Sequence, residues 1–346
     1  MLNIVEKFDD EILDLPAHRL HEKLPGPTLL HLKGKKEPCL FLSALLHGNE
    51  NSGWEVVKNI LLKYKTQQLP RTLSIFIGNV KAARYKKRRL ENQLDFNRTW
   101  CRGEADENKM MLSIIEHMRK RKVFASIDIN NNNGLNPHYG CINKLDKPFL
   151  KLAKEFSSMV IYFIRPFGVQ SLAFSDFCPA ITLETGLPGD EYGINLTTKF
   201  VDHVLNMTSL DTNEDVDKEI DLYHTIGVIK LPGPYDFSFD GKKADIQFIK
   251  GIEGVNFIEI SSDTLLCRLK RNIDRPLIAM DEDGKDVFDV FFTIKEDGLY
   301  TKKAIMPAML TTDINIVRQD CLCYLMEHYD IKRGEKTTNS NSSLWK

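Results

Sequence analysis

The sequence has 346 residues, 42% of them hydrophobic and 27% charged, with 47 lysines and arginines against 48 aspartates and glutamates. This balance excludes a general nucleic-acid binder and a polybasic membrane-surface protein, because both need an excess of positive charge. The composition is that of an ordinary globular protein, and the length predicts about two domains.

No apolar run approaches the ~20 residues of a membrane helix, and the first residues lack a signal-peptide pattern. The seven cysteines are scattered along the chain and odd in number, which favours reduced thiols. We therefore expect a cytoplasmic protein whose partners include neither membrane nor nucleic acid.

Apolar strands alternate with amphipathic helices over the first 210 residues. Short apolar strands that alternate with helices are typical of an α/β structure with a largely parallel sheet. The predicted strands cover 37–46, 72–80, 122–129, 158–164 and 180–185, and the predicted helices cover 51–64, 106–119 and 190–207.

The pattern changes after about residue 210, where an acidic and polar segment suggests a linker. Residues 223–312 contain short β-rich runs separated by Gly, Pro and Asp turns, which predicts a small all-β domain. A helix-like stretch follows over residues 313–329. The expected divisions are a first domain at 1–210, a β-rich domain at 221–332 and a disordered polar tail at 333–346.

An imidazole and a carboxylate lie close together where the first apolar run ends. His47 and Glu50 are three residues apart in His47-Gly48-Asn49-Glu50, and Gly48 allows a sharp turn between them. The two side chains can converge on one metal ion. The pair alone occurs by chance in many loops, but ligands gather at the carboxyl ends of parallel strands, which strengthens the interpretation.

A second segment, Asp95-Phe96-Asn97-Arg98, carries groups suited to an anion. The guanidinium of Arg98 matches a carboxylate with two parallel hydrogen bonds, and Asn97 can add a third. The basic run that precedes this segment, residues 86–89, is equally typical of a solvated loop.

Two further polar groups follow predicted strands. Residues 128–139 read DINNNNGLNPHY, and four successive asparagines are unusual in a loop chosen only for solubility. Glu184 ends the apolar run ITLE. In a partly desolvated site its pKa would rise toward the working pH, as a general base requires. Taken alone, Glu184 is explained equally well as a capping or salt-bridged residue.

In this order, the motifs resemble those of the aspartoacylase and succinylglutamate desuccinylase family, in the zinc carboxypeptidase clan. The resemblance implies an α/β fold with a mixed, largely parallel sheet flanked by helices and a smaller C-terminal β domain. The matching stretches are HGNE at 47–50, DFNR at 95–98, the DI-x-N-N-x-G segment at 128–134 and ITLETG at 181–186.

This resemblance implies a zinc-dependent deacylase that cleaves the amide bond of an N-acyl amino acid, a short peptide or a similar small carboxylate-bearing substrate. By position, His47 and Glu50 would bind Zn²⁺, and Glu184 would activate a water molecule and later protonate the leaving amine. Three protein ligands leave the fourth zinc position for that water.

The resemblance also implies the substrate contacts. Arg98 with Asn97 would bind the substrate carboxylate, and Arg89 would polarise the scissile carbonyl. Arg88 is the alternative to Arg89, because the spacing to DFNR is one residue longer here than in aspartoacylases. We expect His138 to contact the substrate or its own loop rather than a metal.

One position departs from the family. Asn130 stands where the family has the histidine that is the third zinc ligand, and an amide oxygen is a poor zinc ligand beside imidazole. Three interpretations stay open. The chain is a relative that binds a carboxylate without competent zinc, or it keeps zinc through a substitute ligand such as His138, or Asn130 is an accidental or engineered replacement in an active enzyme. The sequence predicts neither the acyl group nor the oligomeric state.

Overall fold

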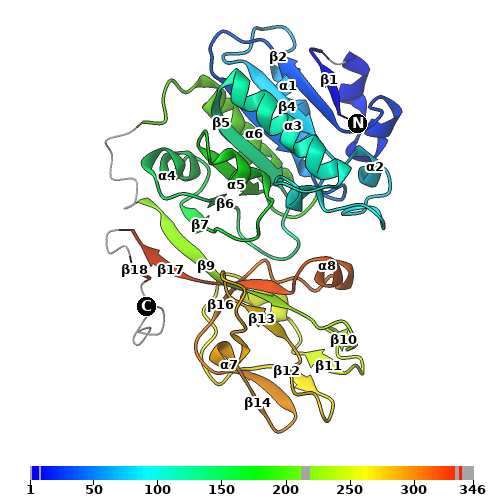
Figure 1. Ribbon diagram of the computed structural model, residues 1–346, viewed down its shortest axis with the longest axis vertical. Helices are drawn as coiled ribbons and strands as arrows, with labels where there is room; N and C mark the ends of the chain where they lie inside the picture. Colours follow the sequence, from blue (N-terminus) through cyan, green and yellow to red (C-terminus); the bar gives the residue numbers. More distant parts are fainter. Residues whose placement is uncertain (1, 8, 212–218, 332–334, 337–346) are drawn as a thin grey trace. The chain divides into compact units, whose positions relative to one another are not determined.

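The computed structural model describes residues 2–7, 9–211, 219–331 and 335–336 (Figure 1). The chain divides into two compact units, one formed by Met1–Asn131 with His138–Asp221 and the other by Asn132–Pro137 with Leu222–Lys346. Most of the predicted linker and all but two residues of the predicted tail lie outside the described residues. In the described part of the chain, no helix is long and apolar enough to cross a membrane.

The first unit is built on a mixed sheet whose strands follow the order β1-β2-β4-β3-β5-β8-β6-β7. Most neighbouring pairs are parallel; β2 with β4 and β6 with β8 are antiparallel. The strands are β1 (Asn3–Val5), β2 (Thr28–Leu32), β3 (Cys39–Ala44), β4 (Leu73–Ile77), β5 (Val123–Asn130), β6 (Tyr139–Ile142), β7 (Met159–Tyr162) and β8 (Ala180–Glu184).

Helices flank this sheet, as the alternating sequence pattern predicts. In α1, Trp54, Val57 and Ile60 share one face and are fully buried, which is the amphipathic pattern of a helix on a sheet. Helix α1 packs against α6. The helices are α1 (Ser52–Lys63), α2 (Val80–Ala83), α3 (Asp106–Arg121), α4 (Lys147–Lys154), α5 (Gln170–Phe174) and α6 (Glu191–Asn206), with 3₁₀ turns η1 (Asp10–Asp14), η2 (Ala17–Glu22) and η3 (Phe96–Arg98).

The central strands bring three chain segments to one edge of the sheet. Strand β5 pairs in parallel with β3 on one side and β8 on the other. All residues of β3 and β8 are buried, which fits their nearly continuous apolar sequences. Because the three strands run in the same direction, the residues that follow them meet at their carboxyl ends.

In the second unit β17 pairs with β9 on one side and with β16 on the other, and β13 also pairs with β9 and β18 with β17. A separate five-stranded sheet has the order β10-β11-β12-β15-β14. Its core is rich in phenylalanine and branched aliphatic side chains. The elements are β9 (Asp221–Lys230), β10 (Phe237–Ser238), β11 (Ile246–Phe248), η5 (Ile252–Val255), β12 (Leu265–Leu269), β13 (Ile278–Met280), α7 (Phe288–Phe291), β14 (Phe292–Lys295), β15 (Gly298–Thr301), β16 (Met306–Ala308), α8 (Ile314–Gln319), β17 (Cys323–Asp330) and β18 (Glu335–Lys336).

The helix predicted over residues 313–329 is wrong. Helix α8 begins after Asp313, whose side chain accepts from two backbone N–H groups, and it ends at Gln319. The remainder is strand β17, which pairs antiparallel with β9 over Cys323–His328. Tertiary pairing with β9 therefore overrides the local helical pattern of this segment.

Candidate active site

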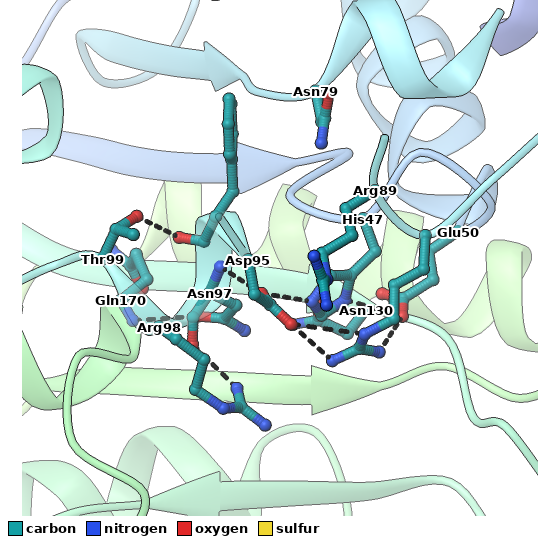
Figure 2. A network of polar contacts seen from close by, with 12 residues as sticks. His47, Glu50, Asn79, Arg89, Asp95, Asn97, Arg98, Thr99, Asn130 and Gln170 are labelled. Carbon is teal, nitrogen blue, oxygen red and sulfur yellow. Dashed lines mark hydrogen bonds and ion pairs between the residues drawn. The ribbon is translucent and has the colours of Figure 1, made fainter. Parts of the chain in front are cut away.

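The carboxyl ends of β3, β5 and β8 carry four of the predicted site residues. Figure 2 shows three of them, His47, Glu50 and Asn130. His47 and Glu50 lie in the turn between β3 and α1 and are only 4% and 2% exposed. Asn130 and Glu184 are the last residues of β5 and β8, and they are direct partners in the register of these strands. The carboxyl ends of three parallel strands thus form one buried polar site.

Both ring nitrogens of His47 face carboxylates. Nδ1 lies 2.8 Å from Oε1 of Glu50, and Nε2 lies 2.9 Å from Oδ1 of Asp95. Burial and the nearby Arg88 lower the pKa of His47, but Glu50 and Asp95 outweigh them and raise it to about 9. Without a metal, the ring is therefore a cation between two anions.

Arg88 joins His47, Glu50 and Asp95 in one charge network. Its Nη2 donates to Oδ2 of Asp95 at 3.1 Å, and its Nη1 lies 3.5 Å from Oε1 of Glu50. Burial raises the pKa of Asp95, but His47 and Arg88 outweigh burial and hold it well below its usual value. A role for Asp95 was not predicted from the sequence, although its place in DFNR was a signal.

Of the two adjacent arginines, Arg88 rather than Arg89 reaches the charge network. Arg88 is buried, whereas the Nη1 of Arg89 donates to the backbone oxygen of Gln93 at 2.9 Å within its own loop. The expected role of Arg89 at the scissile carbonyl stays a prediction. Arg88 contacts two carboxylates of the site, those of Glu50 and Asp95.

Asn97 and Arg98 make internal contacts. The amide of Asn97 donates to Oδ2 of Asp128 at 3.3 Å and accepts from the backbone N–H of Gln170 at 3.1 Å. Arg98 donates to the backbone oxygen of Asn97, and its side chain extends away from His47 in Figure 2. Their contact with a substrate carboxylate stays a prediction.

Asp128 lies within one of the four motifs, but a role for it was not predicted from the sequence. It is fully buried and accepts hydrogen bonds from Oγ of Ser43 at 2.6 Å and from Nδ2 of Asn130 at 2.7 Å. Burial outweighs these hydrogen bonds and raises its pKa to about 6. The available signal was a carboxylate near the end of a mostly apolar strand.

Glu184 has the environment of a proton acceptor and donor. It is 5% exposed, and its Oε2 has no hydrogen-bond partner among the described residues. Burial, followed by the negative charges of Glu50 and Asp128, raises its pKa well above the usual value, against the opposing effect of Arg88. The carboxyl group thus shares its electrostatic environment with the charge network.

His138 lies in a different polar contact. Its Nε2 is 3.0 Å from Oδ2 of Asp190, and its ring packs edge-on against Tyr192 with centroids 5.3 Å apart. Over the described ranges, no group of three His, Cys, Asp or Glu side chains is placed to hold a metal ion. The structure therefore does not bring His138 into a ligand set with His47 and Glu50.

The donor atoms at the sheet edge decide whether zinc fits this site. His47 and Glu50 present donors side by side, and Asp95 contacts the second ring nitrogen as carboxylates commonly do for metal-ligating histidines. The third donor is Asn130, whose Nδ2 is engaged by Asp128, so that only Oδ1 is left for a cation. The residues fit a divalent metal as a His–Glu–amide set, with a weaker third donor than imidazole.

Comparison with solved structures shows which known proteins share this fold. The chain has the fold of succinylglutamate desuccinylase from Vibrio parahaemolyticus, with a TM-score of 0.57, 12% identity and coverage of 87% of this chain and 86% of that one. The succinylglutamate desuccinylase from Chromobacterium violaceum matches with a TM-score of 0.54 and 14% identity, over 86% of each chain. Murine aminoacylase 3 gives 0.54 at 13% identity, over 85% of this chain and 97% of that one.

A family model matches part of the sequence. Residues 36–132 match the model of the succinylglutamate desuccinylase/aspartoacylase catalytic domain. The match includes His47, Glu50 and Asn130 and ends before His138 and Glu184. No curated protein matches the chain. The resemblance inferred from the four motifs is confirmed by this match and by the fold.

Proposed function

We propose that the protein is a zinc-dependent deacylase that cleaves the amide bond of an N-acyl amino acid or a similar small carboxylate-bearing substrate. The observation that carries the proposal is the meeting of the His47–Glu50 pair with Glu184 at one sheet edge. The family match over residues 36–132 and the names of the similar solved proteins, desuccinylases and an aminoacylase, support this reaction class.

In this proposal His47, Glu50 and Oδ1 of Asn130 hold the zinc ion. Bound zinc would supply a water molecule that ionises near neutral pH. Asp95 keeps the imidazole of His47 oriented, because it contacts the ring nitrogen that faces away from Glu50.

Glu184 serves as general base and then as general acid. Its buried Oε2 takes a proton from the attacking water and returns it to the leaving amine nitrogen. Burial and two neighbouring carboxylates favour the protonated form, which makes Glu184 an effective proton donor in the second half of the reaction.

The remaining predicted residues bind the substrate. Arg98, with Asn97, binds its carboxylate, and Arg89 donates hydrogen bonds to the oxyanion that develops at the scissile carbonyl. His138 contacts the bound molecule from the loop that precedes β6. A short peptide with a free carboxylate offers the same groups and is the second kind of substrate expected.

Hydrolysis measured over a panel of N-acyl amino acids and short peptides, with saturating zinc, tests this proposal. The wild type should release amine, and Glu184→Gln should lower kcat by about 10²–10⁴-fold while it binds the same amount of zinc. A zinc-loaded wild type that hydrolyses no member of the panel would contradict the proposal.

Asn130 favours one alternative, a carboxylate-binding protein that works without competent zinc. That function predicts that an N-acyl amino acid raises the melting temperature of metal-free protein. No shift at millimolar ligand would rule out the alternative, and a shift without hydrolysis would favour it.

A further inference from the structure

The amide of Asn130 has a defined orientation in the site. Its Nδ2 donates to Oδ2 of Asp128 at 2.7 Å. A carboxylate accepts hydrogen bonds, so the amide nitrogen and not the amide oxygen must face Asp128. The Oδ1 of Asn130 is therefore turned away from Asp128.

Asp128 is itself held in place. Ser43, on the neighbouring strand β3, donates to its Oδ1 at 2.6 Å, and Asn97 donates to its Oδ2 at 3.3 Å. The side chain is 0% exposed, so water does not compete for these oxygens. Two donors from two other segments thus fix the carboxylate against which Asn130 is aligned.

The side chains of Asn131 and His138, which follow Asn130 in the chain, form hydrogen bonds with other groups. The amide of Asn131 accepts from the backbone N–H of Ser52 and donates to the backbone oxygen of Gly186, which joins the start of α1 to the turn after β8. His138 contacts Asp190. Of the side chains of Asn130, Asn131 and His138, that of Asn130 donates to the buried carboxylate of Asp128.

We propose that Asp128 is a positioning residue that presents Oδ1 of Asn130 as the third ligand of a divalent cation, beside His47 and Glu50. The inference rests on the proposed function, in that a cation binds at this sheet edge. The resulting donor set has one nitrogen and two oxygens. Oxygen donors suit harder cations such as Mn²⁺, so zinc should be preferred over manganese by a smaller factor than in a site with a second imidazole.

Calorimetric titration of metal-free protein with Zn²⁺ and with Mn²⁺ tests the role of Asp128. Asp128→Ala should lower zinc affinity by about 10–100-fold, because Asn130 loses the partner that orients it. Asp128→Asn should stay closer to the wild type, since its carbonyl oxygen can still accept from Asn130 while its amide nitrogen donates to Ser43. The conservative variant also keeps the test valid if Asp128→Ala fails to fold. Equal zinc affinities for wild type and Asp128→Ala would overturn the positioning role.

Variants of Asn130 test ligation itself. Asn130→His should raise zinc affinity more than manganese affinity, and Asn130→Leu should weaken both. Zinc binding by Asn130→Leu as tight as that of the wild type, or no zinc binding by the wild type, would overturn the inference. A wild type that binds zinc through Asn130 but hydrolyses nothing supports the inference and contradicts the proposed deacylase.

Discussion

Arg88, Asp95, His47 and Glu50 form a buried network in which two cations meet two anions. Charges so far from water are costly unless each is paired, and removal of one partner leaves another uncompensated. The network keeps the His47–Glu50 pair in place before any substrate or metal arrives. Its stability therefore depends on Arg88, which contacts both carboxylates.

Replacement of Arg88 by methionine should lower the free energy of unfolding by about 3–5 kcal/mol, because Asp95 and Glu50 lose their shared cation. Urea unfolding of metal-free protein measures this change. Arg89→Met is the matched control, and its free energy of unfolding should lie within about 1 kcal/mol of that of the wild type. This substitution should instead lower kcat if Arg89 contacts the oxyanion. Equal destabilisation by the two substitutions would contradict the assignment of Arg88 to the network.

Among the secondary-structure elements, the sequence predicts the strands and helices of the first 210 residues to within three residues of their observed ends, except for β1, β2, β6, α2, α4, α5 and the 3₁₀ turns, which were not predicted. It succeeds because β3, β5 and β8 are nearly continuous apolar runs. The meeting of His47, Asn130 and Glu184 follows from those parallel strands. The contacts of Arg88 with Glu50 and Asp95 and the buried position of Asp128 were not predicted, because they depend on side-chain packing that spacing does not encode.

Strand β2 and helix α3 share a stacked histidine pair that should make stability depend on pH. The rings of His31 and His117 lie 4.9 Å apart, and His31 contacts Oγ of Ser74 at 2.8 Å. Burial, followed by the charges of Arg121 and His117, lowers the pKa of His31 from 6.5 to about 4. Between these two pH values the unfolded chain holds a proton on His31 that the folded chain does not.

The stabilising effect of neutral His31 is therefore complete above pH 6.5 and lost as the pH falls toward 4. The free energy of unfolding should fall by about 3 kcal/mol between pH 6.5 and pH 4 for this reason. Denaturant unfolding of the wild type and of His31→Gln at several pH values measures it, and the wild type should lose stability more steeply. Parallel curves for the two proteins would show that His31 does not titrate as described.

At the scale of the whole molecule, one short segment of the site's sequence belongs to the second unit. Residues 132–137 follow Asn130 and Asn131 directly, yet they pack with the C-terminal unit. Within that unit the backbone N–H of Met309 donates to Oδ1 of Asn136 at 2.9 Å. A Cβ atom on Gly134 would lie 2.2 Å from the backbone oxygen of Leu310. The second unit thus holds the stretch of chain that continues from the end of β5.

Substitution Gly134→Ala should therefore displace this segment and disturb the adjoining Asn130. We expect kcat/KM to fall by up to about 100-fold, the cost of a misplacement on the order of 1 Å at a reacting centre. Gly254→Ala is the control in the same unit, because nothing lies within 4 Å of its added Cβ. Steady-state hydrolysis by both variants measures the effect. Equal activities would show that the second unit does not position the segment.

We propose that a metal ion binds at the sheet edge although Asn130 stands where the related proteins have a histidine. Elemental mass spectrometry of protein purified without chelator and dialysed against zinc measures this most directly. We expect about one zinc ion per chain, reduced to near zero in Asn130→Leu. A wild-type chain that retains no zinc would contradict it.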